Sequence, residues 1–107
     1  MTINLRESEV QERGVELLRK LGAQVYVTSQ HRASSVTKGV PDVLAFPPGR
    51  PHFFWEAKSA SGKQSPEQAE FQRHCEAASP RVAYVLGGTD ALWAHLTQIG
   101  LLCKGAA

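Results

Sequence analysis

The chain has 107 residues, of which 42% are hydrophobic and 21% charged, and its formal net charge is +2. These values are typical of one globular domain spanning residues 1–107, and they exclude a disordered chain. No apolar run approaches the roughly 18 residues that a membrane span needs, and the N-terminus lacks the apolar segment of a secretory signal. Because Cys75 and Cys103 are too few for a disulfide framework, we expect a cytoplasmic protein with reduced thiols.

The first half of the chain predicts a helix, a strand and a loop. Over residues 7–21, apolar side chains recur at spacings of three, four and seven, which indicates an amphipathic helix ended by Gly22. The β-branched and aromatic run over 23–29 predicts a strand. The polar, small and glycine-ended segment over 30–39 predicts a loop.

The second half begins with a predicted β-hairpin. Its arms are the strand-like runs over 40–46 and 52–59, joined by the Pro- and Gly-rich connection PPGRP. A helix is predicted over 65–79, a strand over 81–87 and a last short helix over 89–100. Since the strand after the second helix can pair parallel to an earlier one, we expect an α/β fold of order α-β-β-β-α-β-α, with a small mixed sheet flanked by helices.

Two carboxylates and a lysine lie on the arms of this hairpin. If residues 47–51 form the connection, Asp42 stands opposite Glu56, and Lys58 shares their face because side chains alternate along a strand. Facing carboxylates repel unless a proton or a cation intervenes, and Mg²⁺ binds a few carboxylate oxygens. The pattern therefore predicts a Mg²⁺ site for phosphodiester hydrolysis, at which Mn²⁺ substitutes because oxygen ligands accept both ions.

Each motif alone has an ordinary explanation. Glu56 and Lys58 could form an exposed ion pair, and Pro41-Asp42 could simply open a strand. Against this, a carboxylate in the apolar run FFWEA is costly to bury without a partner. Between residues 30 and 64 the only acids are Asp42 and Glu56. This charge pattern suits a polyanionic substrate and a cation, although a solvated surface explains it equally well.

The segments GVPDVLAF and FFWEAKSASGKQSPEQAEFQ together resemble the PD-(D/E)xK nuclease superfamily. More narrowly, they are similar to the virus-type replication-repair nuclease (VRR-NUC) domain. The resemblance extends over about residues 7–96 and departs from the family in Trp55 and Ala57, which flank the glutamate. It implies a restriction-endonuclease-like core, divalent-metal-dependent DNA endonuclease activity, and a phage or prophage setting in DNA replication and repair.

The resemblance also implies the residues of the site. Asp42 and Glu56 match the metal ligands, and the backbone carbonyl of Ala57 would be a third metal contact. Lys58 matches the catalytic lysine, which would orient or deprotonate the attacking water or neutralise charge on the phosphate.

Two helical positions have competing interpretations. Gln68 matches an accessory active-site glutamine, but it also completes a capping box with Ser65 at the start of its helix. In the first helix, Glu9 best matches the family's glutamate and would be a further metal ligand. Gln11 and Glu12 lie within one turn of Glu9 and could reach the same metal site. Alternatively, Glu9 is simply exposed on the surface, as glutamates in such charge-rich turns usually are.

Several other side chains are candidates for DNA contact. Lys38, Lys63 and Arg32 are expected to bind phosphates from loops beside the site. Trp55 and Trp93 lie in apolar runs, which favours positions in the core over stacking on bases.

The leading hypothesis is a DNA endonuclease selective for branched or junction structures. A chain of this length has no room for a separate domain that reads sequence, so shape and backbone contacts must select the substrate. Symmetric cleavage needs two active sites, so a homodimer is expected, with no membrane partner and no small-molecule substrate. The alternatives are a non-catalytic nucleic-acid-binding module with the same fold and an unrelated α/β domain with accidental motifs. RNA as substrate and cleavage from an end stay open.

Overall fold

The computed structural model describes residues 5–28 and 38–103. The described elements are α1 (Glu7–Lys20), β1 (Gln24–Val27), β2 (Val43–Phe46), β3 (Phe53–Ala57), α2 (Pro66–Ala78), β4 (Ala83–Gly87) and α3 (Thr89–Gln98). The described strands form one sheet in the order β1-β2-β3-β4, in which only the β3–β4 pair is parallel. The predicted element order and the small mixed sheet are confirmed, and each strand is shorter than its predicted run.

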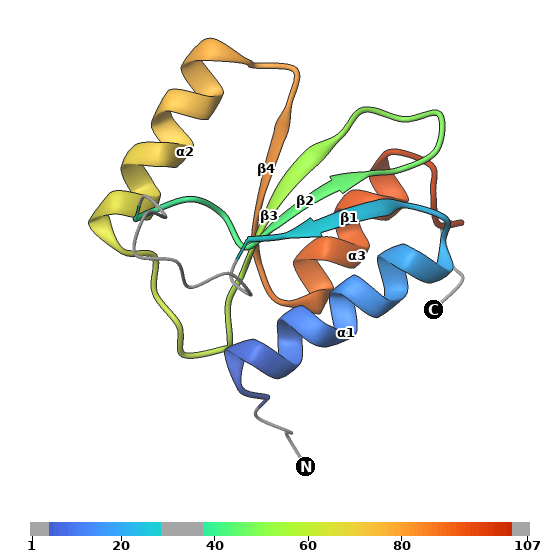
Figure 1. Cartoon of the computed structure of the whole chain (residues 1–107), viewed down its shortest axis with the longest axis horizontal. Helices are drawn as coiled ribbons and strands as arrows, with labels where there is room; N and C mark the ends of the chain where they lie inside the picture. Colours follow the sequence, from blue (N-terminus) through green and yellow to red (C-terminus); the bar gives the residue numbers. More distant parts are fainter. Residues whose placement is uncertain (1–4, 29–37, 104–107) are drawn as a thin grey trace.

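The helices cover the two faces of the sheet unequally. Helices α1 and α3 pack against each other and against one face, whereas α2 lies on the other face beside β4 (Figure 1). On the α2 side, the part of the sheet formed by β1 and β2 therefore has no described helix over it (Figure 1). Within the described ranges, no helix is long and apolar enough to cross a membrane.

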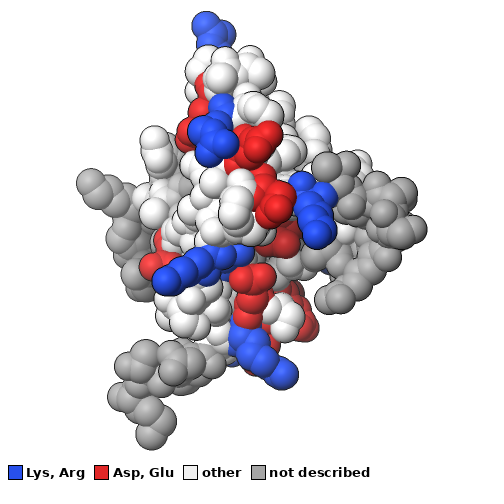
Figure 2. All heavy atoms as spheres, turned by 90° about the vertical axis from the view of Figure 1, so that its left-hand side faces the viewer, with Lys and Arg blue, Asp and Glu red and all other residues white. Residues whose placement is uncertain are grey.

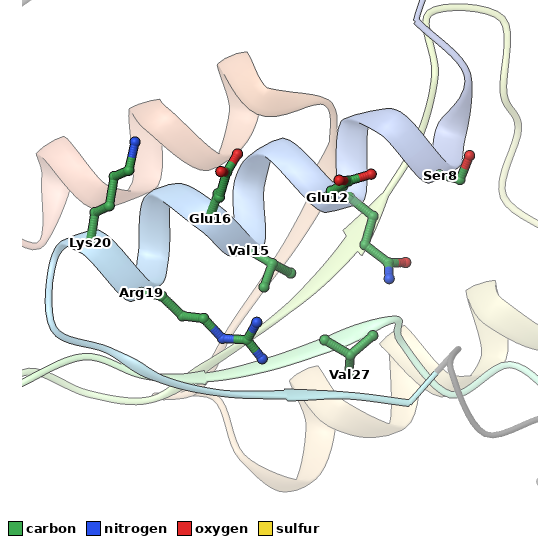
Figure 3. Close-up of a pocket in the computed structure, with 8 residues that line it drawn as sticks. Ser8, Glu12, Val15, Glu16, Arg19, Lys20 and Val27 are labelled. Atoms are coloured by element: carbon green, nitrogen blue, oxygen red, sulfur yellow. The ribbon is translucent and has the colours of Figure 1, made fainter.

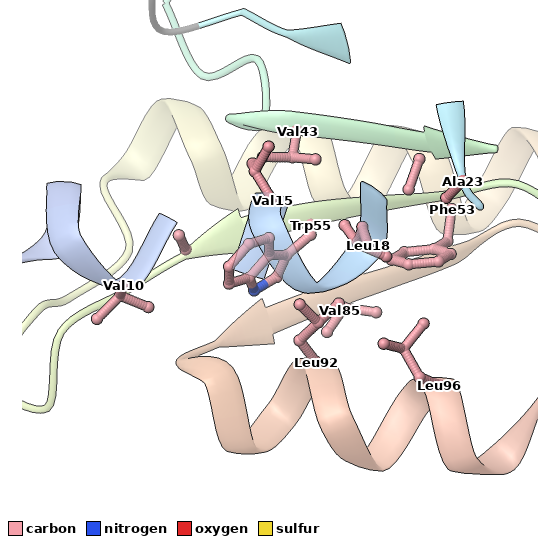
Figure 4. Close-up of a cluster of buried hydrophobic side chains, with 12 residues drawn as sticks. Val10, Val15, Leu18, Ala23, Val43, Phe53, Trp55, Val85, Leu92 and Leu96 are labelled. Atoms are coloured by element: carbon pink, nitrogen blue, oxygen red, sulfur yellow. The ribbon is translucent and has the colours of Figure 1, made fainter. Parts of the chain in front are cut away.

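The core lies between the sheet and the α1–α3 layer (Figure 4). Trp55 is fully buried there, and its indole N–H donates a hydrogen bond to the Gly87 carbonyl at 3.0 Å. A Cβ added at Gly14 would lie 2.1 Å from the Trp55 ring, so the tryptophan needs a glycine on α1. Trp93 is 37% exposed. Its predicted core position is wrong because Leu92 and Leu96 provide the buried stripe of α3.

The hairpin has the predicted register. Val43 pairs with Trp55 and Ala45 with Phe53, and the rings of Phe46 and His52 stack at 5.3 Å beyond the last pair. Continuing the register by one residue beyond the Val43–Trp55 pair places Asp42 opposite Glu56. Asp42 is also hydrogen-bonded to the residue that follows β1, because the Thr28 N–H donates to the Asp42 carbonyl at 2.9 Å.

Helix α2 begins with the predicted capping box. The Gln68 N–H donates to Ser65 Oγ at 3.1 Å, and the Ser65 N–H donates to Gln68 Oε1 at 2.8 Å. Pro66 occupies the first turn, where a missing N–H leaves no partner unsatisfied. Cys75 and Cys103 are free thiols, as expected.

Candidate active site

Glu56 is a fully buried carboxylate on the α2 face of β3. Its Oε1 accepts hydrogen bonds from the Tyr84 hydroxyl and from Gln64 Nε2, the latter at 3.3 Å. Its Oε2 is buried without a hydrogen-bond partner in the described structure, and Lys58 Nζ lies 3.4 Å from it. A buried carboxylate oxygen in this state is costly unless a cation compensates its charge.

Asp42 approaches the same strand from the start of β2. Its Oδ2 accepts a hydrogen bond from the Ala57 N–H at 3.0 Å. Burial raises the pKa of Asp42 to about 6, although the Ala57 hydrogen bond lowers it. The negative charges of Glu7 and Glu56 raise this pKa further, while Lys58 lowers it. Asp42 therefore lies within the electrostatic reach of three charged groups and would gain from a nearby cation.

Lys58 follows the last residue of β3 and lies among oxygen atoms from three elements. Its Nζ donates to Gln68 Oε1 at 3.1 Å, and it lies 3.4 Å from Glu56 Oε2 and 3.7 Å from Glu7 Oε1. Its own N–H donates to the Gly87 carbonyl at 3.0 Å, which extends the β3–β4 pairing. These contacts hold a largely buried ammonium beside Glu56.

Gln68 contributes to both the helix cap and this cluster. The same Oε1 atom accepts from the Ser65 N–H and from Lys58 Nζ. The two interpretations of Gln68 are therefore compatible, because the cap fixes the side chain in a position where it also contacts the lysine.

The first-helix glutamate that contacts Lys58 is Glu7 rather than Glu9. Glu9 Oε1 instead accepts from the N–H and Nε of Arg6, which caps α1 and lowers the pKa of Glu9. Gln11 and Glu12 line a groove of about 540 Å³ between α1 and β1 (Figure 3). Glu9 is therefore paired with Arg6 at the start of its own helix, and Glu7 is the glutamate that lies beside Lys58.

Asp42 and Glu56 both carry the oxygen ligands that a divalent cation prefers. Both offer carboxylate oxygens, and one of these is buried without a hydrogen bond. No group of three or more His, Cys, Asp or Glu within the described ranges is arranged to hold a metal. Mg²⁺ binds through one or two carboxylates and keeps other positions for water and phosphate oxygens. The residues therefore fit a divalent cation with oxygen ligands.

Tyr84 and Gln64 belong to the cluster and were not predicted. Burial raises the pKa of Tyr84, and its hydrogen bond to Glu56 raises it further. Tyr84 reaches Glu56 because β4 pairs with β3, with Leu86 opposite Glu56 and Tyr84 opposite Phe54. The alternation in RVAYVLG indicates a shared face for Tyr84 and Leu86, but only the strand register identifies the partner.

The predicted phosphate-binding residues lie in different surroundings. Lys38 is exposed and lines a shallow hollow with Glu67, Glu70 and His74. Lys63 is exposed in the connection between β3 and α2. Arg32 lies outside the described residues. On the face that α2 presents, basic and acidic side chains are interspersed, so no field of one sign covers its described part (Figure 2).

Comparison with known proteins identifies the fold. No family model matches the sequence, and no curated protein matches it. Among solved structures, a chain described as "VRR_NUC domain" superposes with a TM-score of 0.66 at 21% sequence identity. The match covers 87% of this chain and 95% of the other. At this level of identity the likeness shows the fold, which confirms the fold implied by the sequence resemblance.

Proposed function

We propose, from the VRR-NUC nuclease fold that this chain has, that it is a divalent-metal-dependent DNA endonuclease that hydrolyses phosphodiester bonds. One observation carries the proposal. A fully buried glutamate, Glu56, keeps one oxygen without a hydrogen bond, and Lys58 lies 3.4 Å from that oxygen. Asp42 lies opposite Glu56 in the extended register. Aspartate and glutamate can hold a divalent cation that assists hydrolysis of phosphodiesters, and a lysine can stabilise the charge that develops on the phosphate.

Each side chain has a distinct role in the proposed reaction. Asp42, Glu56 and the Ala57 carbonyl would hold the cation, which supplies charge stabilisation and a bound water of lowered pKa. Lys58 would place positive charge beside the scissile phosphate or orient the attacking water. Gln68 and Glu7 hold the Lys58 ammonium, since both contact its Nζ.

Tyr84 and Gln64 position the metal-binding carboxylate. Both donate to Glu56 Oε1, so the hydrogen bonds fix the orientation of the side chain and leave Oε2 as the oxygen available to a cation. Such outer partners of a metal-binding carboxylate normally tune its affinity for the ion.

The substrate we propose is branched or junction DNA. The described part of the fold contains one small sheet and three helices, so recognition must depend on backbone contacts and DNA shape. Lys63 and Lys38 would contribute phosphate contacts. Symmetric cutting of a junction requires a twofold homodimer, and sedimentation as a monomer at micromolar concentration would contradict that expectation.

The decisive experiment is nicking of a supercoiled plasmid and of a labelled four-way junction. Each substrate is incubated with Mg²⁺, Mn²⁺ or EDTA, and wild type is compared with Asp42→Ala and Lys58→Ala. We expect cutting that depends on the metal and is abolished by both substitutions. Binding of the junction without cutting under any metal would favour the non-catalytic module instead, and activity that survives in Asp42→Ala would refute the assignment.

A further inference from the structure

An aromatic patch is exposed on the part of the sheet that α2 leaves open. Gln24 and Tyr26 of β1 line a shallow hollow of about 400 Å³ with Leu44 and Phe46 of β2. Tyr26, on the edge strand β1, is 60% exposed, and Phe46, at the end of β2, is 41% exposed. Two large aromatic side chains therefore form an exposed apolar patch, which is more informative than a single exposed residue. We call these residues, together with His52, the aromatic patch.

Ring contacts give the patch a defined shape. Tyr26 meets Phe46 edge to face with their centroids 5.8 Å apart. Phe46 in turn stacks on His52 at 5.3 Å with an interplanar angle of 25°. Because the rings support one another, their exposed faces and edges are held in place before any partner arrives.

The patch shares its sheet face with the proposed active site. Tyr26 pairs with Leu44, which pairs with Phe54, and Glu56 lies two residues beyond Phe54 on the same face. From strand spacing and rise, the Cα atoms of Tyr26 and Phe46 lie about 12–14 Å from that of Glu56. A nucleic acid strand held at Glu56 could therefore reach the patch within a few nucleotides.

We propose that the aromatic patch stacks unpaired bases of the DNA strand that the active site cuts. This inference rests on the proposed function and specifies its substrate as DNA with unpaired bases beside the cleaved bond. Aromatic side chains stack on the face of any base, so the patch selects single-stranded character without reading sequence. Among the described residues, those that line the hollow are all uncharged. The patch would therefore provide stacking, and the proposed phosphate contacts would come from Lys38 and Lys63.

The exposed area favours bases over a protein partner. An aromatic side chain offers about 150–250 Å², so the exposed fractions of Tyr26 and Phe46 present roughly 200 Å² together. A stable dimer buries about 800 Å² on each partner, which is far more than the patch presents. One or two stacked bases match an area of this size.

The test compares binding of two labelled DNAs by fluorescence anisotropy in EDTA, where metal-dependent cutting cannot occur. One DNA is a blunt duplex and the other is the same duplex with an unpaired tail. We expect Tyr26→Thr combined with Phe46→Thr to weaken binding of the tailed DNA by about tenfold or more, the effect of losing one stacked base. Affinity for the blunt duplex should change by less than about twofold. Threonine is chosen because its β-branched side chain keeps the preference for a strand.

Two controls separate stacking from loss of structure. Tyr26→Phe keeps the ring and should bind the tailed DNA like wild type. Trp93→Ala removes an exposed aromatic side chain from α3, on the opposite side of the sheet, and should also leave binding unchanged. In wild type, a 2-aminopurine placed in the tail should lose fluorescence on binding, which tests stacking without any substitution. Unchanged fluorescence, or equal loss of affinity for both DNAs, would overturn the proposal.

Other outcomes distinguish this inference from the proposed function. If the double variant converts a sedimenting dimer to a monomer, the patch is a subunit interface and the inference fails. If the wild type cuts junctions through Asp42 but the patch variant retains its preference for tailed DNA, only the inference fails. If no metal supports cutting while tail binding still depends on the patch, the nuclease proposal fails and the stacking surface stands.

Discussion

The carboxylate of Asp42 accepts a hydrogen bond from the Ala57 N–H at 3.0 Å, which joins the start of β2 to the end of β3. The bond places a second negative charge next to the strand that carries Glu56. Burial and the nearby carboxylates raise the pKa of Asp42 to about 6, so ionised Asp42 destabilises the metal-free fold at neutral pH. A neutral side chain in place of ionised Asp42 would therefore make the metal-free protein more stable.

Asp42→Asn should therefore stabilise the metal-free protein at neutral pH. Asparagine keeps an oxygen for the Ala57 N–H and removes the charge. Because the folded-state pKa is raised above the ordinary value of 3.8, the penalty is absent below about pH 3, where Asp42 is protonated in both states, and grows as pH rises from about 4 through about 6. In EDTA at about pH 7.5 we expect the variant to be more stable by about 1–3 kcal/mol.

Thermal unfolding at about pH 3 and about pH 7.5 measures this difference. The two proteins should unfold at similar temperatures at the lower pH, and the variant should unfold at a higher temperature at the upper pH. Added Mg²⁺ should raise the unfolding temperature of wild type and leave Asp42→Asn unchanged, because only the wild type keeps both carboxylates. A wild type that Mg²⁺ does not stabilise would count against a metal site at Asp42 and Glu56.

A second prediction concerns the two glutamates of α1. Glu7 contacts Lys58 Nζ at 3.7 Å, whereas Glu9 is paired with Arg6 at the start of its helix. Glu7→Gln should reduce the rate constant for plasmid nicking several-fold, because the Lys58 ammonium loses a charged partner. Glu9→Gln should lower the unfolding temperature slightly through the cap and leave nicking unchanged. If Glu9→Gln reduced nicking and Glu7→Gln did not, Glu9 would be the glutamate that supports the site.

Features that depend on neighbouring residues were predicted correctly from the sequence. The capping box of Ser65 and Gln68 needs only one turn of helix, and the structure contains it. The hairpin register follows from the length of one short connection, so the sequence alone predicts the positions of Asp42 and Glu56 on facing strands.

Features that depend on distant parts of the chain were missed. Tyr84 binds Glu56 only because β4 pairs with β3 in one particular parallel register, which no local pattern specifies. Glu7 rather than Glu9 reaches Lys58 because the rotation of α1 over the sheet is set by packing, including the contact of Gly14 with Trp55. The sequence predicted the helix correctly but could not tell which residue of its first turn faces the lysine.

A third prediction separates the two roles of Gln68. Ser65→Ala removes the hydroxyl that accepts from the Gln68 N–H, which is one half of the capping box. Its loss costs about 0.5–2 kcal/mol in unfolding free energy. Gln68→Ala removes the other half and also the hydrogen bond to Lys58 Nζ. Both variants should unfold at lower temperature, but only Gln68→Ala should lower kcat for nicking. Equal kcat values for the two variants, measured well below their unfolding temperatures, would reduce Gln68 to a helix cap.

A fourth prediction tests whether Tyr84 positions the metal-binding carboxylate. Tyr84→Phe removes the hydroxyl that donates to Glu56 Oε1 and retains the ring, which packs against Phe54 and Phe71. Gln64 then remains as the donor to Oε1, so Glu56 should stay in place but with a less fixed orientation. We expect affinity for Mg²⁺, measured from the unfolding temperature across a metal titration, to fall by about tenfold.

Tyr26→Phe is the matched control for Tyr84→Phe, because it removes a tyrosine hydroxyl from the same sheet face at an exposed position. Its affinity for Mg²⁺ should equal that of wild type. Nicking by Tyr84→Phe should recover at high Mg²⁺ if the hydroxyl acts through metal binding alone. Full affinity for Mg²⁺ combined with lost activity would instead assign Tyr84 to the chemical step, and full affinity with full activity would leave its hydrogen bond to Glu56 without a functional role.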